Sequence, residues 1–271
     1  MSTATAHARL VTAAPERAVV PALARMEARR LMQHPLVLLG FGIWMLNAVR
    51  AIAANGGPRE SFESIDSMLS FYPGIFLILA ANLVATRDLR GGSREILAPV
   101  PARPQERVLA LVLASLVPAL TGLLLVTALH GYFVLDGRFE VAPSVWHVVQ
   151  GPVTLLGACL LGVMLAVWSP ARGTAVIALV GMVALNVWLA GVDDGMLFGP
   201  LMTWPMWGVW SEQWAGLFPG NPSGHVVYLL GLCGMAATAA LVRVADRRRP
   251  VVVLGLCTVA LAVAGGLAQL P

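Results

Sequence analysis

Hydrophobic positions in this chain gather in long, nearly unbroken runs rather than in the spaced stripes of a soluble helix or strand. Seven such runs occur, at residues 36–54, 68–86, 108–135, 148–168, 173–192, 225–241 and 251–270. About 20 helical residues cross the roughly 30 Å of hydrocarbon in a bilayer, where the backbone must satisfy its own hydrogen bonds. The pattern therefore predicts an all-α polytopic membrane protein with six to seven transmembrane helices.

The composition agrees with this class. Hydrophobic residues make up 58% of the chain and charged residues 12%, against about 25% charged residues in an ordinary soluble domain. The three cysteines each lie inside an apolar run and form no CxxC pair, so the sequence suggests neither a disulfide framework nor a metal site. Because about 35 polar or mixed residues precede the first run, we expect no cleaved signal peptide.

The arginines predict an orientation. With the N-terminus in the cytoplasm, 15 of the 18 basic residues lie inside and only Arg50, Arg59 and Arg138 lie outside. The opposite orientation would reverse these numbers, which the positive-inside rule disfavours. We therefore expect a multi-pass protein of a bacterial cell (inner) membrane with a cytoplasmic N-terminus. Residues 246–271 are expected to add a C-terminal transmembrane helix that ends outside, with a re-entrant or surface-lying segment as the alternative.

The segment before the first run divides into two parts. Residues 1–20 lack periodicity and are expected to form a disordered cytoplasmic tail. Residues 21–35 predict an amphipathic interfacial helix, whose Arg25, Arg29 and Arg30 would face the anionic headgroups of the inner surface. The alternatives are a plain topological anchor and a specific docking helix, and both roles are compatible.

The loop at residues 87–107 is a charged island between two apolar runs. Its signals predict one turn of amphipathic helix at residues 95–98, entered through a Gly-Gly-Ser sequence and ended by prolines. A structured loop on the basic side is a candidate docking site for a soluble partner, the alternative being a helix that rests on the headgroups. The residues expected to couple to that partner are Arg90, Arg94, Glu95, Ile96 and Leu97.

The segment before the sixth run is rich in tryptophan. Spacings of three, three and four place the indoles on one face of a helix, and prolines divide the region into short pieces. Since tryptophan favours the headgroup zone, we expect a short re-entrant or interfacial helical region forming an outer aromatic belt. The alternative is a surface on which a ligand stacks. The belt residues are Trp204, Trp207, Trp210 and Trp214.

Catalytic signals in the sequence are weak. The sequence at residues 222–225 matches the PSGH element of phosphatases that use a phosphohistidine, but the chain has no Lys and no His after His225. No acidic residue lies clearly inside a run, which argues against ion-driven transport. His130 is expected to meet water or a backbone carbonyl, while Asn82 and Asn186 are expected to join helices by hydrogen bonds.

The order of these features resembles the membrane subunit of a type 2 ABC exporter. The likeness rests on a basic amphipathic helix that ends at His34-Pro35, two spans, the loop RDLRGGSREILAPVPARPQER, three further spans and an aromatic outer region. It covers roughly residues 25–243, within an expected exporter-like transmembrane domain at residues 21–245. The seventh run departs from the usual six spans of that family.

The resemblance implies a function and partners. Two permease chains, identical or homologous, would stand on two copies of a separate ATP-binding cassette subunit. That subunit would carry the ATP and Mg²⁺, so we expect no cofactor in this chain and no enzyme activity of its own. An apolar or amphipathic substrate would be exported. Membrane lipids are expected as partners and nucleic acid is not. The alternatives are a non-transporting structural or sensor subunit and a membrane-embedded lipid-modifying enzyme.

Overall fold

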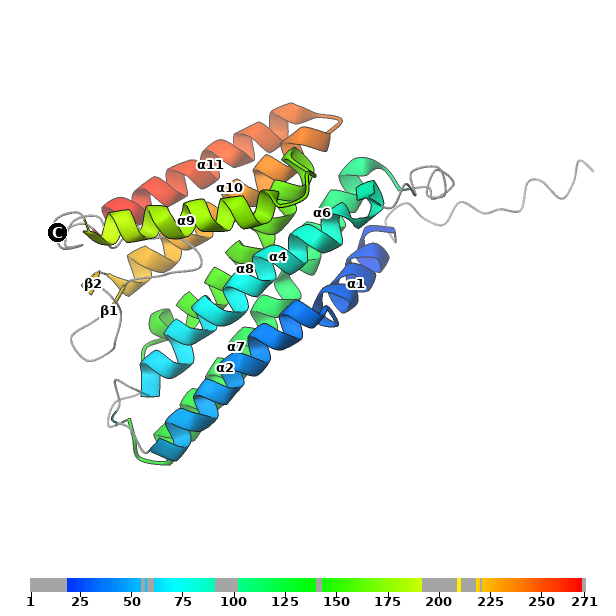
Figure 1. The fold of residues 1–271 in the computed structure, drawn as a ribbon. Helices are drawn as coiled ribbons and strands as arrows, with labels where there is room; N and C mark the ends of the chain where they lie inside the picture. Colours follow the sequence, from blue (N-terminus) through cyan, green and yellow to red (C-terminus); the bar gives the residue numbers. More distant parts are fainter. Residues whose placement is uncertain are drawn as a thin grey trace, which may run out of the picture.

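The structure is a computed structural model, and it describes residues 19–54, 57, 61–90, 102–139, 143–191, 209–210, 218–219 and 221–269. The elements form one elongated bundle of helices that run roughly along a common axis (Figure 1). They are α1 (Val19–Met32), α2 (Pro35–Ala54), η4 (Glu63–Ser67), α4 (Met68–Arg90), α6 (Pro104–Ala114), α7 (Leu116–Leu135), α8 (Val145–Trp168), α9 (Thr174–Gly191), β1 (Val209–Trp210), β2 (Phe218–Pro219), α10 (Pro222–Val244) and α11 (Arg248–Leu267).

Six helical segments of the described chain are long and apolar enough to cross a membrane, as expected of a multi-pass membrane protein. Each of the seven predicted runs contains a helix, and the helix of the fifth run, α9, is the short one, with an apolar stretch of only Thr174–Trp188. The C-terminal run is a full helix, α11, of 20 residues. The six segments are Pro35–Ala54, Ser64–Arg87, Pro104–Leu135, Val145–Trp168, Pro222–Val244 and Arg248–Leu267.

Helix α8 forms the centre of the bundle. It packs against α4, α7 and α10, while α2 covers α4, α11 covers α10 and α9 lies at the periphery (Figure 1). The contact with α4 is very close at Gly162, where a Cβ atom would lie 2.5 Å from the Ile78 carbonyl oxygen. Asn82 crosses the same contact, donating from Nδ2 to the Gly162 carbonyl at 3.3 Å, which confirms its expected role in joining two helices.

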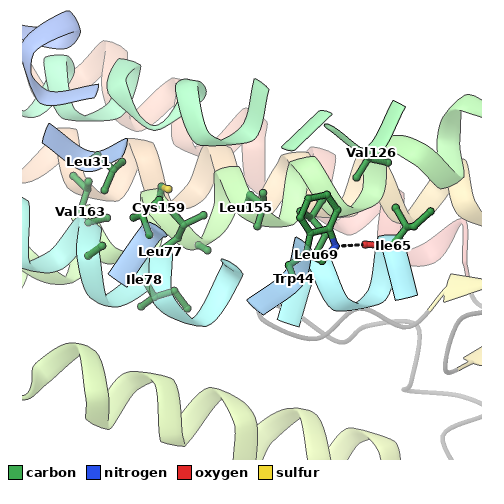
Figure 2. Close-up of a cluster of buried hydrophobic side chains, with 14 of the residues drawn as sticks. Leu31, Trp44, Ile65, Leu69, Leu77, Ile78, Val126, Leu155, Cys159 and Val163 are labelled. Carbon is green, nitrogen blue, oxygen red and sulfur yellow. Dashed lines mark hydrogen bonds between the residues drawn. The ribbon is translucent and has the colours of Figure 1, made fainter. Parts of the chain in front are cut away.

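The hydrophobic core lies where α2, α4 and α8 meet. Leu77, Leu155 and Cys159 are fully buried there (Figure 2). At its other end, Trp44 of α2 donates from Nε1 to the Ile65 carbonyl at 2.7 Å. That carbonyl belongs to η4, a single π-helical turn, and such turns disturb the regular backbone hydrogen bonds. The indole therefore satisfies a buried acceptor while its ring fills the core.

The third run is longer than a bilayer requires. It forms two helices, α6 and α7, that meet at Ser115, and Pro118 occupies the first turn of α7. The Ser115 hydroxyl donates to the Leu111 carbonyl at 3.0 Å. The 32 residues of the pair span roughly 48 Å, against about 30 Å of hydrocarbon. One end of this pair must therefore extend beyond the apolar layer, and α1 packs along α6 at that end (Figure 1).

A labelling experiment tests whether α11 spans the membrane. Arg249 and Ala268 lie at its two ends and are both exposed, so each can be replaced by cysteine in a Cys257→Ala background. In intact cells, a membrane-impermeant maleimide should label Ala268→Cys, and should label Arg249→Cys only after permeabilisation. Cys159 and Cys233 are buried and should stay silent. Labelling of both positions, or of neither, in intact cells would show that α11 does not cross.

Candidate functional site

The two ends of the bundle differ in charge. One end, which we call the basic end, carries the first residues of α2, α6 and α11 and the last residues of α4, α8 and α10. The described arginines concentrate there, and only Arg50 and Arg138 lie at the opposite end. Those at the basic end are Arg25, Arg29, Arg30, Arg87, Arg90, Arg103, Arg107, Arg172, Arg243, Arg247, Arg248 and Arg249.

The buried carboxylate of Glu27 joins helix α1 to α4 at the basic end. Glu27 is only 7% exposed, and its Oε1 accepts from Arg30 Nη1 at 3.1 Å and from Arg87 Nη2 at 2.6 Å. Ala28 and Leu31 complete the buried face of α1. Because Arg87 belongs to α4, the ion pair joins α1 to the last turns of that helix, just before the loop at 91–101.

One of the three predicted arginines of α1, Arg30, takes part in this contact. Arg25, Arg29 and Arg30 are exposed as residues, although Arg30 also reaches Glu27. The helix predicted at 21–35 is therefore present, with its observed bounds at Val19–Met32. Its position on a membrane surface remains a prediction.

The junction between α1 and α2 carries a neutral histidine. The His34 Nδ1 atom accepts from the Leu36 backbone N–H at 3.3 Å, so this ring nitrogen carries no proton. Burial removes water from the imidazole and lowers the pKa of His34 below its ordinary value. The histidine thus acts as an acceptor where the chain turns from α1 into the first span.

The start of α6 connects to the turn between α10 and α11. The Arg103 backbone N–H donates to Glu106 Oε2 at 2.7 Å, which closes the first turn of α6. The Asp246 backbone N–H donates to Gln105 Oε1 at 3.3 Å, and Arg103 Nη1 lies 3.8 Å from Asp246 Oδ2. This ion pair is largely exposed and contributes little stability, but it places the turn after α10 beside the loop that precedes α6.

The predicted coupling residues lie mostly outside the described chain. Arg90 is the last residue of α4. Arg94, Glu95, Ile96 and Leu97, with the helical turn expected there, fall in the undescribed range 91–101. The two helices that flank this loop, α4 before it and α6 after it, both contact α1.

At the opposite end, the structure brings together polar side chains that the sequence kept apart. Asp66 Oδ2 lies 2.7 Å from His130 Nε2, and both side chains are buried. The Phe62 ring stacks on His130 with centroids 5.6 Å apart and meets His147 edge-on at 6.0 Å. His147 Nδ1 lies 2.7 Å from the Ser144 hydroxyl.

Two expectations are therefore wrong. An acidic residue does lie inside a span, because the helix continues upstream of the apolar run through residues 61–67. His130 meets the Asp66 carboxylate rather than water or a backbone carbonyl. The local sequence around Asp66 is polar, and its burial follows only from how the helices pack.

Arg138 closes the C-terminal end of α2. Its guanidinium donates to the Ala51 and Ile52 carbonyls at 2.8 and 2.6 Å and to Asp136 at 2.8 Å. It also lies 5.0 Å from the centroid of the Phe133 ring. A cation at the carbonyl end of a helix is favourable, so this arginine ties the α7–α8 connection to the first span.

The aromatic region before α10 differs from the prediction at Trp210. Val209–Trp210 pairs in parallel with Phe218–Pro219, so the chain is extended there and not helical. Trp204, Trp207 and Trp214 lie outside the described residues. Pro200, Pro205 and Pro219 divide this part of the sequence, so the helical spacing of its tryptophans is a weak indication of a helix.

The PSGH sequence has a structural role. The Asn221 side chain accepts from the Ser223 and Gly224 backbone N–H groups, and Pro222 occupies the first turn, so these residues begin α10. His225 Nδ1 lies 2.7 Å from Gln269 Oε1, which joins the start of α10 to the end of α11.

Within the described part of the chain, no group of three or more His, Cys, Asp or Glu residues could hold a metal ion. Comparisons with protein-family models, with curated proteins and with solved structures gave no match. Conclusions about function therefore rest on the geometry of the two ends of the bundle.

Proposed function

We propose that this chain is the membrane subunit of an ATP-driven exporter, which moves an apolar or amphipathic substrate with energy from a separate ATP-binding cassette subunit. The proposal rests on the resemblance in sequence together with one structural observation. That observation is the attachment of α1 to α4 through Glu27 and Arg87, immediately before the loop at 91–101.

This attachment supports a mechanical role for the basic end. A soluble subunit that binds the loop through Ile96 and Leu97 would pull on the C-terminal end of α4 and on the N-terminal end of α6. Because α1 contacts both helices, the same movement would reach α1 and, through the short junction at 33–34, the first span. Packed helices transmit such displacements because they are close to rigid.

Loss of the two apolar loop residues tests the proposal. Burying each of these side chains in a partner cleft is worth roughly 1.5–3 kcal/mol, so the double change Ile96→Asp and Leu97→Asp should weaken binding of the ATPase subunit by at least about 100-fold. The measurement is co-purification of the ATP-binding cassette protein with the chain, followed by ATPase activity in proteoliposomes.

The matched control keeps the apolar surface. Ile96→Val with Leu97→Met should retain the partner and its activity. Two results would reject the proposal: a wild-type chain that co-purifies with no ATP-binding protein, or an Asp variant that keeps both the partner and substrate-stimulated hydrolysis. The first result would instead favour a structural or sensor subunit of another complex, or an enzyme.

One observation gives some support to a membrane-embedded enzyme. Asp66, His130, Ser144 and His147 gather around Phe62 at the opposite end. However, Asp66 faces His130, while Ser144, the N-cap residue of α8, faces His147 in the first turn of that helix. Nucleophile, base and acid therefore do not form one connected chain as acyl transfer requires, and the exporter remains the better proposal.

A further inference from the structure

The buried cluster of Asp66, His130 and Phe62 has no part in the transport mechanism proposed above. An ionisable side chain inside a membrane-spanning helix is costly and usually marks a functional site. Asp66 is fully buried at the start of the second span, and His130 on α7 is 5% exposed. Neither residue serves the basic end, where the proposed partner would bind.

The burial of the two groups favours a net-neutral pair, which holds one proton more than a carboxylate beside a neutral imidazole. His130 Nε2 and Asp66 Oδ2 lie 2.7 Å apart, with the geometry of an ion pair rather than of a straight hydrogen bond. A neutral imidazole could donate its single N–H from Nε2 to the carboxylate at this distance, but the buried pair would then keep an uncompensated negative charge in a medium of low dielectric constant. A carboxylate beside an imidazolium has no net charge, and a net charge of zero costs the least free energy in a buried site.

The surroundings favour opening of this contact to water. Gln150 of α8 is fully buried, and neither atom of its amide has a hydrogen-bond partner among the described residues. The next residue, Gly151, lies against the Asp66 carbonyl, so this stretch of α8 faces the same contact. Unpaired buried polar groups cost free energy that hydration returns, which makes the closed arrangement easier to separate.

The other charged groups near the pair are few. His147 of α8 faces Phe62 and is held by Ser144, so it is a second histidine beside the pair but does not touch Asp66. Arg138 reaches His130 only through the rings of Phe133 and Phe139, and it is already bound to Asp136. Helix α2 contributes the uncharged Trp44.

We propose that Asp66 and His130 form a proton-binding site across η4 and α7, which holds one proton while these two elements are packed and releases it to water when they separate. On separation, the imidazolium N–H bond breaks, the proton passes to solvent and the carboxylate stays ionised. The packing of η4 against α7 then depends on the pH at the opposite end of the bundle.

Hydrogen exchange of the full-length protein in lipid nanodiscs tests this proposal. Above about pH 6.5, a histidine exposed to water is mostly neutral, so each opening event should release one proton. Once the intrinsic exchange rate is divided out, the opening constant should rise about tenfold per pH unit. The peptides to follow cover residues 61–70 and 126–135, and the reference peptide lies in α10.

Two variants assign the effect. Asp66→Asn and His130→Gln keep polar side chains of similar size but cannot hold the exchangeable proton as an ion pair, so the opening constant should become independent of pH. His147→Gln should keep the tenfold dependence. If one of the first two variants does not fold, the other provides the same test.

Three outcomes would overturn the proposal. The first is a wild-type opening constant that does not change with pH. The second is an unchanged pH dependence in a folded Asp66→Asn or His130→Gln variant. The third is loss of the dependence in His147→Gln alone, which would place the proton on the other histidine. None of these results depends on an ATPase partner, so the proton site and the exporter proposal can fail separately.

Discussion

Replacing Gly162 with alanine will lower the stability of the bundle, although alanine is the better helix former. The new Cβ atom would lie 2.5 Å from the Ile78 carbonyl oxygen and 2.9 Å from Ala81 Cβ. Because the first of these atoms belongs to the backbone, α4 and α8 must move apart, which also weakens the hydrogen bond from Asn82. Overpacking of this kind costs about 1–3 kcal/mol, more than the roughly 1 kcal/mol gained in helix propensity.

The measurement is thermal unfolding in a mild detergent, followed by size-exclusion chromatography of the heated samples. The Tm of Gly162→Ala should fall by roughly 5 °C. Gly181→Ala is the matched control, because Gly181 lies in α9 and a Cβ atom added there would meet nothing within 4 Å. That variant should be at least as stable as the wild type. Equal stability of the two variants would mean that the close approach of α4 and α8 is absent from the folded protein.

Replacing Glu27 with glutamine will release α1 from the end of α4. The change keeps the shape of the side chain but removes the charge that accepts from Arg30 and Arg87. Hydrogen bonds to charged groups contribute about 1.5–3 kcal/mol when buried, and the partial exposure of both arginines favours the lower value. The population of detached α1 should therefore rise about tenfold.

Limited trypsin digestion reports this detachment, because α1 carries its own cleavage sites at Arg25 and Arg29. Cleavage at both sites should accelerate about tenfold in Glu27→Gln if opening and closing are fast compared with cleavage. Asp246→Asn removes a charge from an exposed ion pair at the same end and should leave the cleavage rate unchanged. Equal acceleration in both variants would point to a general charge effect instead.

The helical architecture could be predicted from the sequence because hydrophobic runs follow directly from the thickness of a bilayer. Asn82 could also be assigned to helix contacts, since an amide inside an apolar run has few other partners. The break at Ser115 was not predicted, because a serine and a proline inside a long apolar run do not interrupt its hydropathy.

The Asp66–His130 pair could not be predicted for a different reason. Asp66 lies beside Glu63 and two serines, so its local sequence resembles a polar loop. Its burial involves His130 of α7 and Gly151 of α8, which lie more than 60 positions further along the chain. Pairings at such separation depend on the order in which helices pack, and hydropathy carries no information on that order. Conversely, Glu27 could be placed on a charged helix, but its inward direction depends on α4 and α6.

The close pairing of α10 and α11 bears on how the chain enters the membrane during synthesis. Only residues 245–247 separate the two helices, and a Cβ atom on Gly265 would lie 2.3 Å from the Tyr228 backbone nitrogen. So short a connection brings the two helices together as an antiparallel hairpin. Arg247, Arg248 and Arg249 lie at its turn and at the start of α11. Helix α11 therefore has its main packing partner as soon as it is made, and we expect α10 and α11 to insert as a preformed pair rather than one after the other.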